Sequence, residues 1–302
     1  MLNAKPTWKS TLKTLLYLAP LLLITAVFTI WPLLNAFLMS VYTKYNYFTD
    51  HVGAIGWNNF AYLWHDPLFH LACRNTLLLA LVATPLTVAL SLLIAYGLNR
   101  IHHLARFFRT IYFLPFVTST IAVGLVWNWI FRLDGGLLNR ILGWFGYSAI
   151  DWLNDPHYAL AALMVVCVWQ GLGFNILLFL ASLNHIDQRY TAAARLDGAN
   201  AWQRFTNVTW PLLLPMTILI IVNTALTNFK VFDQVYALFH GSAGPGNADL
   251  TLLYYLYQKF YVENQYAVAA ASGVIFFLLI GGVTLLTYGY FRHRRRQMGG
   301  RL

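Results

Sequence analysis

Six long apolar runs constrain the fold of this chain more than any other feature of its sequence. They cover Leu15–Leu38, Leu71–Leu98, Ile111–Phe131, Tyr158–Leu183, Pro211–Phe229 and Ala267–Phe291. A helix needs about 20 apolar residues to cross the hydrocarbon core of a bilayer. Charged residues make up only 10% of the 302, whereas a soluble domain carries about 25%. We therefore predict an all-α membrane protein with six transmembrane helices.

The predicted transmembrane domain covers residues 15–291, between an N-terminal tail (residues 1–14) and a basic C-terminal tail (residues 292–302). The first apolar run is too long for a signal peptide and lacks a small-residue cleavage site, so we expect it to be retained. Cys73 and Cys167 lie in apolar segments and show no metal-ligand spacing. We expect two buried thiols and no metal site.

The positive charges indicate how the chain is oriented. The net charge is +10, and most of the 20 Lys and Arg residues lie in the two tails, the second-to-third connection and the fourth-to-fifth connection. Positive charge marks the cytoplasmic side of a membrane, so both termini are expected in the cytoplasm. The basic C-terminal tail fits an anchor that contacts anionic lipid, and this distribution argues against nucleic acid as a partner.

The connection between the fourth and fifth runs, residues 184–210, contains the polar segment YTAAARLDGANAWQRF. Alanine is the best helix former and Asp is a preferred N-cap, so we expect a helix over Asp187–Leu196. Gly198 can take the left-handed conformation that ends a helix, and a second helix is expected over Asn200–Asn207. An alanine-rich face before a glycine turn suits a docking element, although a plain amphipathic connector fits the same residues.

This loop resembles the EAA signature of carbohydrate-type (maltose- or glycerol-phosphate-like) permease subunits of binding-protein-dependent ABC importers. The matching residues are Ala193, Ala194, Asp197, Gly198, Ala199, Asn200, Trp202, Phe205 and Pro211. Further similarity covers nearly the whole chain, in Gly56–Phe69, Asn75–Thr76, Phe113–Pro115, Val231–Leu238 and the segment YYLYQKFY.

The resemblance implies a cytoplasmic coupling helix that lies in a groove of an ATPase. The residues expected there are Ala192, Ala193, Ala194, Asp197, Gly198, Ala199 and Phe205. The implied partners are a second homologous permease subunit, an ATPase dimer and an extracytoplasmic solute-binding protein, in the inner membrane of a prokaryote. ATP and Mg²⁺ are expected on the partner ATPase, so no cofactor is expected in this chain.

The sequence departs from the family pattern at two places. Ala192 occupies the position of the usual Glu, and the only Glu of the chain, Glu263, is predicted on the opposite side of the membrane. We therefore expect this loop to dock by shape and backbone more than by charge. The outer GGP turn is also altered, to HGSAGPG.

Polar residues inside the apolar runs are candidates for a solute pathway, because such groups usually face a bundle interior or a cavity. Amides beside aromatic rings suit a sugar, whose hydroxyls form hydrogen bonds while a ring stacks on its C–H face. Hydrogen bonds between helices are the alternative for each residue. The resemblance favours a pathway, with candidates Trp127, Asn128, Gln170, Phe174, Asn175, Thr224, Asn228 and Lys230. Lys230 could also meet an anionic group, but we expect it to pair with Asp233.

The chain shows no signature of an enzyme. It has no P-loop with a Gly-Lys pair, no HExxH, no GxSxG and no GxGxxG, so any ATP hydrolysis must come from a partner. The expected function is solute import as a permease subunit of an ATP-driven importer. The alternative is a stand-alone ion-coupled carrier or channel, which should carry acids within its spans; only Asp233 lies near a span, at its outer end.

Overall fold

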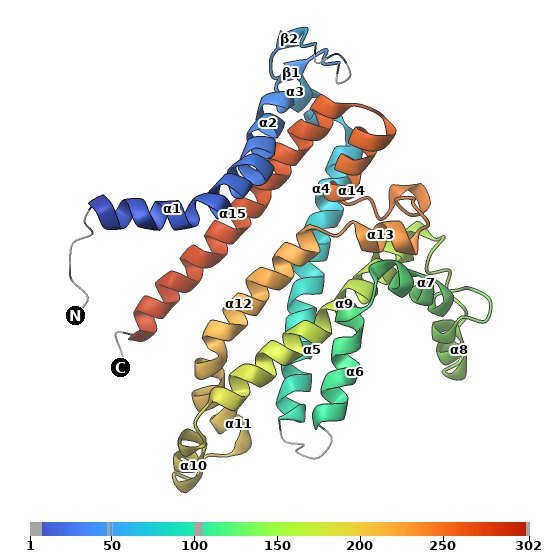
Figure 1. Ribbon diagram of the computed structural model, residues 1–302. Coiled ribbons are helices and arrows are strands. Elements are labelled where there is room, and N and C mark those ends of the chain that lie inside the picture. Colours follow the sequence, from blue (N-terminus) through green and yellow to red (C-terminus); the bar gives the residue numbers. More distant parts are fainter. Residues whose placement is uncertain (1–7, 47–48, 50, 100–104, 300–302) are drawn as a thin grey trace. The chain divides into compact units, whose positions relative to one another are not determined.

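The computed structural model describes residues 8–46, 49, 51–99 and 105–299 of the chain (Figure 1). Parts of both predicted tails, residues 1–7 and 300–302, lie outside these described residues. The chain divides into two units. The first contains residues 1–65 and 256–277, and the second contains residues 66–255 and 278–302.

The first unit begins with a continuous helical segment, residues 8–40, of which Leu12–Ser40 contains the first expected span. It is made of α1 (Trp8–Thr25), a π-helical turn (Ala26–Ile30) and α2 (Trp31–Ser40). Pro20 lies within α1 and Trp31-Pro32 opens α2, so the backbone bends at positions where helix hydrogen bonds are already interrupted.

A small cap follows α2 and contains part of Gly56–Phe69, the first family-like segment. The short antiparallel strands β1 (Tyr42–Thr43) and β2 (Ala54–Ile55) precede α3 (Asn58–His65). Asn59 is buried, and its amide nitrogen donates 2.9 Å hydrogen bonds to the carbonyl oxygens of Ser40 and Tyr42. Asn59 therefore fixes the chain where it leaves α2.

The only Glu of the chain has a structural partner in this unit. Lys259 is buried and lies in a π-helical turn (Gln258–Val262) that precedes α15 (Tyr266–Gly299). Its Nζ lies 2.8 Å from Glu263 Oε2 and 3.2 Å from the hydroxyl of Tyr62. The pairing offsets the cost of removing the ammonium group from water.

The second unit contains the elements from α4 to the start of α14. Its elements are α4 (Pro67–Leu78), a π-helical turn (Leu79–Ala83), α5 (Thr84–Leu98), α6 (Ala105–Val117), α7 (Thr120–Ile130), α8 (Leu137–Trp144), α9 (Pro156–His185), α10 (Gln188–Leu196), α11 (Ala201–Arg204), a second π-helical turn (Phe205–Thr209), α12 (Trp210–Phe229), α13 (Asp233–Leu238), a 3₁₀ turn (Pro245–Asn247) and the start of α14 (Leu252–Tyr257). α9 begins where Asp155 accepts a 2.9 Å hydrogen bond from the backbone N–H of His157, before Pro156 in the first turn. In Figure 1, α10 and α11 lie at one end of this unit, and α7, α8 and α13 lie at the other.

Five helical segments of the described chain are long and apolar enough to cross a membrane, and a sixth is counted if one bent pair forms a single span. The bent pair lies in the run expected over Ile111–Phe131, and its two parts, residues 110–117 and 120–130, differ in direction by 109°. Pro115 interrupts the helix ladder there, and Ser119 takes an extended backbone (φ −55°, ψ 130°).

The second loop helix, expected over Asn200–Asn207, is continuous with the fifth expected span. α11, the π-helical turn and α12 run on as one helical segment, Ala201–Phe229. Pro211 lies in the first turn of α12, directly after the π-helical turn. Hydrogen bonds in such a turn skip one more residue than in an α-helix, so the chain passes this proline, which has no N–H, without a break.

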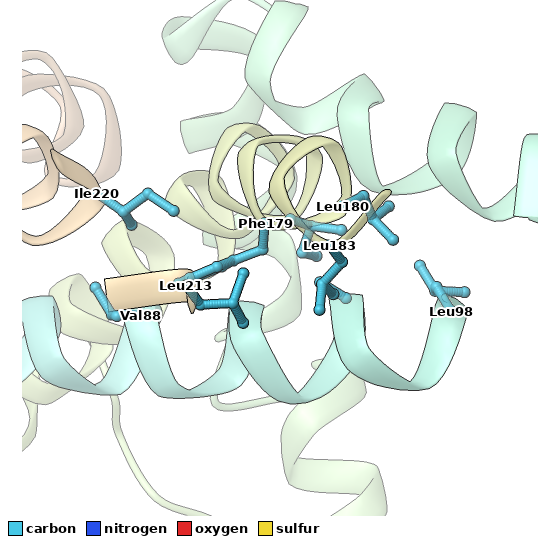
Figure 2. Packing of buried hydrophobic residues seen from close by; sticks show 9 residues of the cluster. Val88, Leu98, Phe179, Leu180, Leu183, Leu213 and Ile220 are labelled. Atoms are coloured by element: carbon cyan, nitrogen blue, oxygen red, sulfur yellow. The ribbon is translucent and has the colours of Figure 1, made fainter. Parts of the chain in front are cut away.

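The core of the second unit forms where α5, α9 and α12 meet (Figure 2). Its buried residues are Val88, Ala95, Leu98, Ile176, Phe179, Leu180, Leu183, Leu213 and Ile220. Small residues allow close approach of α5 and α9: a Cβ at Gly171 would lie 3.0 Å from a methyl carbon of Thr87. This packing fixes the orientation of α9 and α12, which carry most of the predicted pathway residues.

Asn75 and Thr76, the second family-like segment, tie α4 to a segment more than 170 residues away. The Asn75 amide donates to the carbonyl oxygens of Ala248 (2.8 Å) and Leu250 (3.1 Å), and the hydroxyl of Thr76 accepts from the N–H of Leu252 at 2.8 Å. Both side chains are buried. Their role is therefore to hold the segment that follows α13.

Candidate functional site

A cavity of about 170 Å³ lies among α6, α9, α12 and the start of α13. Five of the eight predicted pathway residues line it: Gln170, Phe174, Asn175, Thr224 and Asn228. The structure thus brings together residues from the fourth and fifth expected spans. Among the described residues, no side chain that lines this cavity is charged.

Three of these residues also join neighbouring helices. The Asn175 amide in α9 donates a 2.9 Å hydrogen bond to the hydroxyl of Thr224 in α12, and the Asn228 amide donates one of 2.9 Å to the hydroxyl of Thr84 in α5. Asn175, Thr224 and Asn228 are at most 6% exposed. These hydrogen bonds are of the kind that the packing alternative expects, and each of the three residues also contributes to the cavity wall.

Gln170 takes part in a different arrangement that links three helices. Its amide oxygen accepts a 3.0 Å hydrogen bond from Gln234 of α13, and its amide nitrogen lies 3.4 Å from the hydroxyl of Thr120 in α7. Gln170 and Gln234 are half-buried, unlike the Asn–Thr pairs. This chain of polar groups is accessible from the cavity and can exchange partners with a bound hydroxyl.

An aromatic wall completes the cavity. The ring of Phe174 stacks on that of Phe116 with centroids 5.0 Å apart and an interplanar angle of 19°. Both residues line the cavity. Rings beside amides and hydroxyls offer an apolar face together with hydrogen-bonding groups, which is the composition that a polar ligand with C–H faces requires.

Several lining residues were not among the predicted pathway residues, namely Phe116, Cys167, Gly171, Asn223, Thr227, Val231 and Gln234. A signal was present for some of them. Thr227 precedes Asn228 and lies four residues after Asn223, so both can border the Thr224–Asn228 face of one helix. Gln234 lies beyond the end of α12, and its position depends on the turn into α13.

Three predicted pathway residues lie outside this cavity. The Trp127 ring packs edge-on against that of Trp169 at 5.5 Å, and Asn128 donates to the carbonyl oxygen of Leu238 at 3.2 Å. Lys230 is exposed at the C-terminal end of α12. Neither Trp127 nor Lys230 contributes to the cavity wall, and Asn128 lines a separate cavity.

The expected ion pair between Lys230 and Asp233 is wrong: both residues are described, and no ion pair joins them. Asp233 instead begins α13, where a carboxylate is stabilised by the positive end of the helix dipole. Within the described part of the chain, no group of three His, Cys, Asp or Glu side chains is placed to hold a metal ion.

The loop between α9 and α12 forms the expected helix and glycine turn. Asp187 accepts a 2.9 Å hydrogen bond from the N–H of Arg189, which confirms it as the N-cap of α10. Gly198 has φ +79°, and the N–H of Ala199 donates to the carbonyl oxygen of Ala194 at 2.9 Å. This is a Schellman cap, which only a residue tolerant of positive φ can complete without strain.

The second half of the loop is fixed by a capping box. The Asn200 side chain accepts from the N–H of Gln203 at 2.9 Å, and the Gln203 side chain accepts from the N–H of Asn200 at 2.8 Å. Phe205 packs its ring edge-on against Tyr96 of α5, with centroids 5.1 Å apart. The loop is therefore a folded element attached to α5.

The face of α10 is apolar as well as small. Ala192, Ala193, Asp197 and Gly198 are exposed, whereas Ala194, Ala199 and Phe205 are half-buried within the loop. Leu196 is 90% exposed and Tyr190 59%, and sequence reasoning missed both. Exposed side chains of this size beside alanines are typical of a surface that another protein covers.

Comparison with known proteins agrees with this architecture. Residues 87–297 match the family described as "Binding-protein-dependent transport system inner membrane component". The "Lactose transport system permease protein LacF" of Rhizobium radiobacter is 31% identical over 93% of this chain and 94% of its own length. The "Arabinooligosaccharides transport system permease protein AraP" of Bacillus subtilis (strain 168) is 31% identical over 90% of this chain and 86% of its own.

Two further relatives extend the comparison. The "sn-glycerol-3-phosphate transport system permease protein UgpA" of Salmonella typhimurium is 29% identical over 98% of this chain and 99% of its own. A chain of a bacterial ABC transporter involved in the import of the acidic polysaccharide alginate has the same fold, with a TM-score of 0.79 at 21% identity over 95% of this chain and 98% of that one. The family resemblance of the chain is thereby confirmed, and the chain belongs to the binding-protein-dependent transport system inner membrane components.

Proposed function

We propose that this chain is a permease subunit of an ATP-driven importer and that it translocates a neutral sugar or oligosaccharide. The observation that carries the substrate class is the cavity among α6, α9, α12 and α13, whose lining combines amides, hydroxyls and two stacked rings without a charged side chain. An anionic solute would enter such a cavity without a compensating charge, at a high desolvation cost. Lys230 does not line the cavity and supplies no such charge.

The relatives support a role in solute import, and the lining of the cavity decides between a neutral and an anionic solute. Two of them are named for the neutral solutes lactose and arabino-oligosaccharides, and one is named for the anion sn-glycerol 3-phosphate. The neutral lining favours the first kind of solute. The binding protein delivers the solute from outside, on the side where α7 and α13 lie.

The coupling loop is proposed to dock on an ATPase subunit of a dimer, and a second permease subunit completes the pathway. The exposed Ala192, Ala193 and Leu196 form the contact, and the loop transmits motion because Phe205 and the capping box join it to α5 and α12. Both termini then lie in the cytoplasm, as the basic tails indicate. ATP binding to the ATPase can shift the permease between its inward-facing and outward-facing states only if the contacts of the ATPase with this loop differ between the two states.

Uptake into right-side-out membrane vesicles that contain the assembled transporter tests this function. We expect ATP-dependent uptake of lactose or an arabino-oligosaccharide, with little uptake of glycerol 3-phosphate. Uptake that persists without ATP and collapses with an ionophore would indicate a stand-alone ion-coupled carrier. Preferred uptake of the anion would show that the substrate class is wrong.

A further inference from the structure

A second, larger cavity lies in the same unit, at the end of α9 opposite the coupling loop. Its volume is about 520 Å³, within the roughly 300–1,000 Å³ typical of ligand pockets. Three segments line it: residues 128–134, 151–154 and 238–245. Its polar and charged side chains are Asn128, Arg132, Asp134, Asp151, Asn154, His240 and Ser242.

One buried side chain holds two of these segments side by side. Asn139 of α8 is 8% exposed, and its amide nitrogen donates to the carbonyl oxygens of Arg132 (3.2 Å), Leu133 (3.2 Å) and Ile150 (2.9 Å). Its amide oxygen accepts from the N–H of Ile150 and from the indole N–H of Trp152, at 3.1 and 3.0 Å. These walls are therefore set by a saturated buried amide.

The third segment is fixed in the same way. Asn128 of α7 donates to the carbonyl oxygen of Leu238 and lies 3.2 Å from Nε2 of His240. The hydroxyl of Tyr254 donates to the carbonyl oxygen of Gly241 at 2.6 Å, and Gly241 takes φ +80°. The cavity is thus a built site whose shape does not depend on its charged side chains.

Among the described residues, the charged side chains of this cavity form no ion pair or hydrogen bond with residues outside it. Arg132 and Asp134 are exposed, and no ion pair or hydrogen bond of their side chains is found among the described residues. Asp151 accepts from the Asn154 amide through both carboxylate oxygens, at 3.0 and 3.3 Å. The cavity therefore offers carboxylate acceptors, amide groups and a guanidinium donor.

We infer that this cavity is a second solute site, which binds a neutral, hydroxyl-rich ligand such as a sugar unit at the side opposite the coupling loop. Carboxylates and amides together accept and donate to neighbouring hydroxyls. One Arg against two Asp leaves a net formal charge of −1, which repels phosphate or uronate groups. The inference rests on the proposed function and extends it with a site outside the first cavity.

Helix α13 separates the two cavities. Gln234 lines the first and His240, which follows its end, lines the second. Between them α13 packs closely on α7: a Cβ at Gly124 would lie 2.5 Å from the Cβ of Ala237. We expect solute held in the second cavity to reach the first only when this contact opens.

Protection of a cysteine from labelling tests the site in the assembled transporter. Cys73 and Cys167 are first changed to Ala, and Asn154→Cys is introduced in membrane vesicles that also contain the partner subunits. We expect lactose or an arabino-oligosaccharide, whichever the vesicles transport, to slow modification by a membrane-impermeant thiol reagent several-fold. Arg140→Cys on α8, exposed and outside the cavity, is the control and should be modified at an unchanged rate.

Two further variants report on recognition. Asp134→Asn and Arg132→Gln, in the Asn154→Cys background, should raise the sugar concentration that gives half-protection several-fold. A sugar that the same vesicles import could leave the rate of thiol modification at Asn154→Cys unchanged. That result would overturn the second site and leave the proposed function intact. Protection that needs the binding protein and is equal with and without sugar would identify a docking surface instead, and would also overturn the inference. Failure to import either neutral sugar would contradict the proposed function itself.

Discussion

The amide of Gln234 in α13 donates a 3.0 Å hydrogen bond to the amide oxygen of Gln170 in α9. Gln170 also lies 3.4 Å from the hydroxyl of Thr120, so one half-buried side chain connects three helices at the cavity. These helices pack where the two cavities approach one another. We expect the Gln170–Gln234 pair to separate when the transporter opens at this end of α9, and so to act as a closure there.

Gln234→Ala should weaken this closure. A hydrogen bond between membrane helices contributes about 0.6 kcal/mol on average and up to about 1.7 kcal/mol, so we expect the equilibrium between closed and open states to shift by roughly 3- to 20-fold. Basal ATPase activity should rise and sugar uptake per ATP should fall. Asp233→Asn, an exposed neighbour in α13, is the control. Normal coupling in Gln234→Ala would show that the pair is only structural.

The Asn228–Thr84 hydrogen bond should contribute mainly to stability. Both side chains are buried, so Asn228→Leu leaves a hydroxyl without its partner and should lower the melting temperature of the detergent-solubilised protein. A double-mutant cycle with Thr84→Val should give a coupling of about 0.6–1.7 kcal/mol. A melting temperature that is unchanged while uptake is lost would instead assign Asn228 to solute contact.

The apolar runs predicted most of the helices because length and hydropathy alone decide whether a segment can span a bilayer. They did not predict the 109° bend between α6 and α7. A proline within an apolar run is compatible with a straight, kinked or broken helix, and the outcome depends on packing that periodicity does not describe.

The site was predicted to the extent that it follows helix periodicity. Thr224 and Asn228 share a face because they are four residues apart, and both line the cavity. The partner of Asn228 is Thr84, 144 positions away, and no local rule links those positions. Gln234 was missed for the same reason, since the turn of residues 230–232 places it.

The glycine turn of the coupling loop should tolerate few residues. Gly198 has φ +79°, and an added Cβ would meet nothing within 4 Å, so any cost is a backbone cost of about 1–2 kcal/mol. Gly198→Val should reduce ATP-coupled uptake, whereas Gly198→Asn should retain most of it because Asn accepts this conformation. Gly97→Ala, at another open position but with ordinary helical backbone, is the control. Normal uptake in Gly198→Val would remove the turn from the coupling mechanism.

Restoring the family's Glu tests how the loop docks. Ala192 is exposed on α10, so Ala192→Glu should change the stability of the chain by less than about 0.5 kcal/mol. We expect the partner ATPase to remain bound in co-purification, at least as tightly as with the natural loop. Gln188→Glu, at an exposed position of the same helix outside the proposed contact, is the control for added charge. Loss of the ATPase only in Ala192→Glu would indicate a groove that has been rebuilt around alanine.

Asp249, between α13 and α14, is the one buried carboxylate in the described chain for which neither oxygen has a hydrogen-bond partner. Its Oδ2 packs against Gly244, which has φ +78° and leaves no room for a Cβ. Burial raises the pKa of the Asp249 carboxyl from 3.8 to about 8. The carboxyl therefore keeps its proton in the folded chain at neutral pH.

The stability of the protein should consequently fall as the pH rises from about 4 to about 8. In this range the unfolded chain releases the Asp249 proton and the folded chain retains it, so each increase in pH favours unfolding, and the effect levels off above the folded pKa. Asp249→Asn removes this contribution. We expect its melting temperature to equal that of the natural protein near pH 4 and to exceed it by more than about 2 °C near pH 9. Parallel melting curves for Asp249→Asn and the natural protein across this pH range would mean that Asp249 is ionised in the folded state.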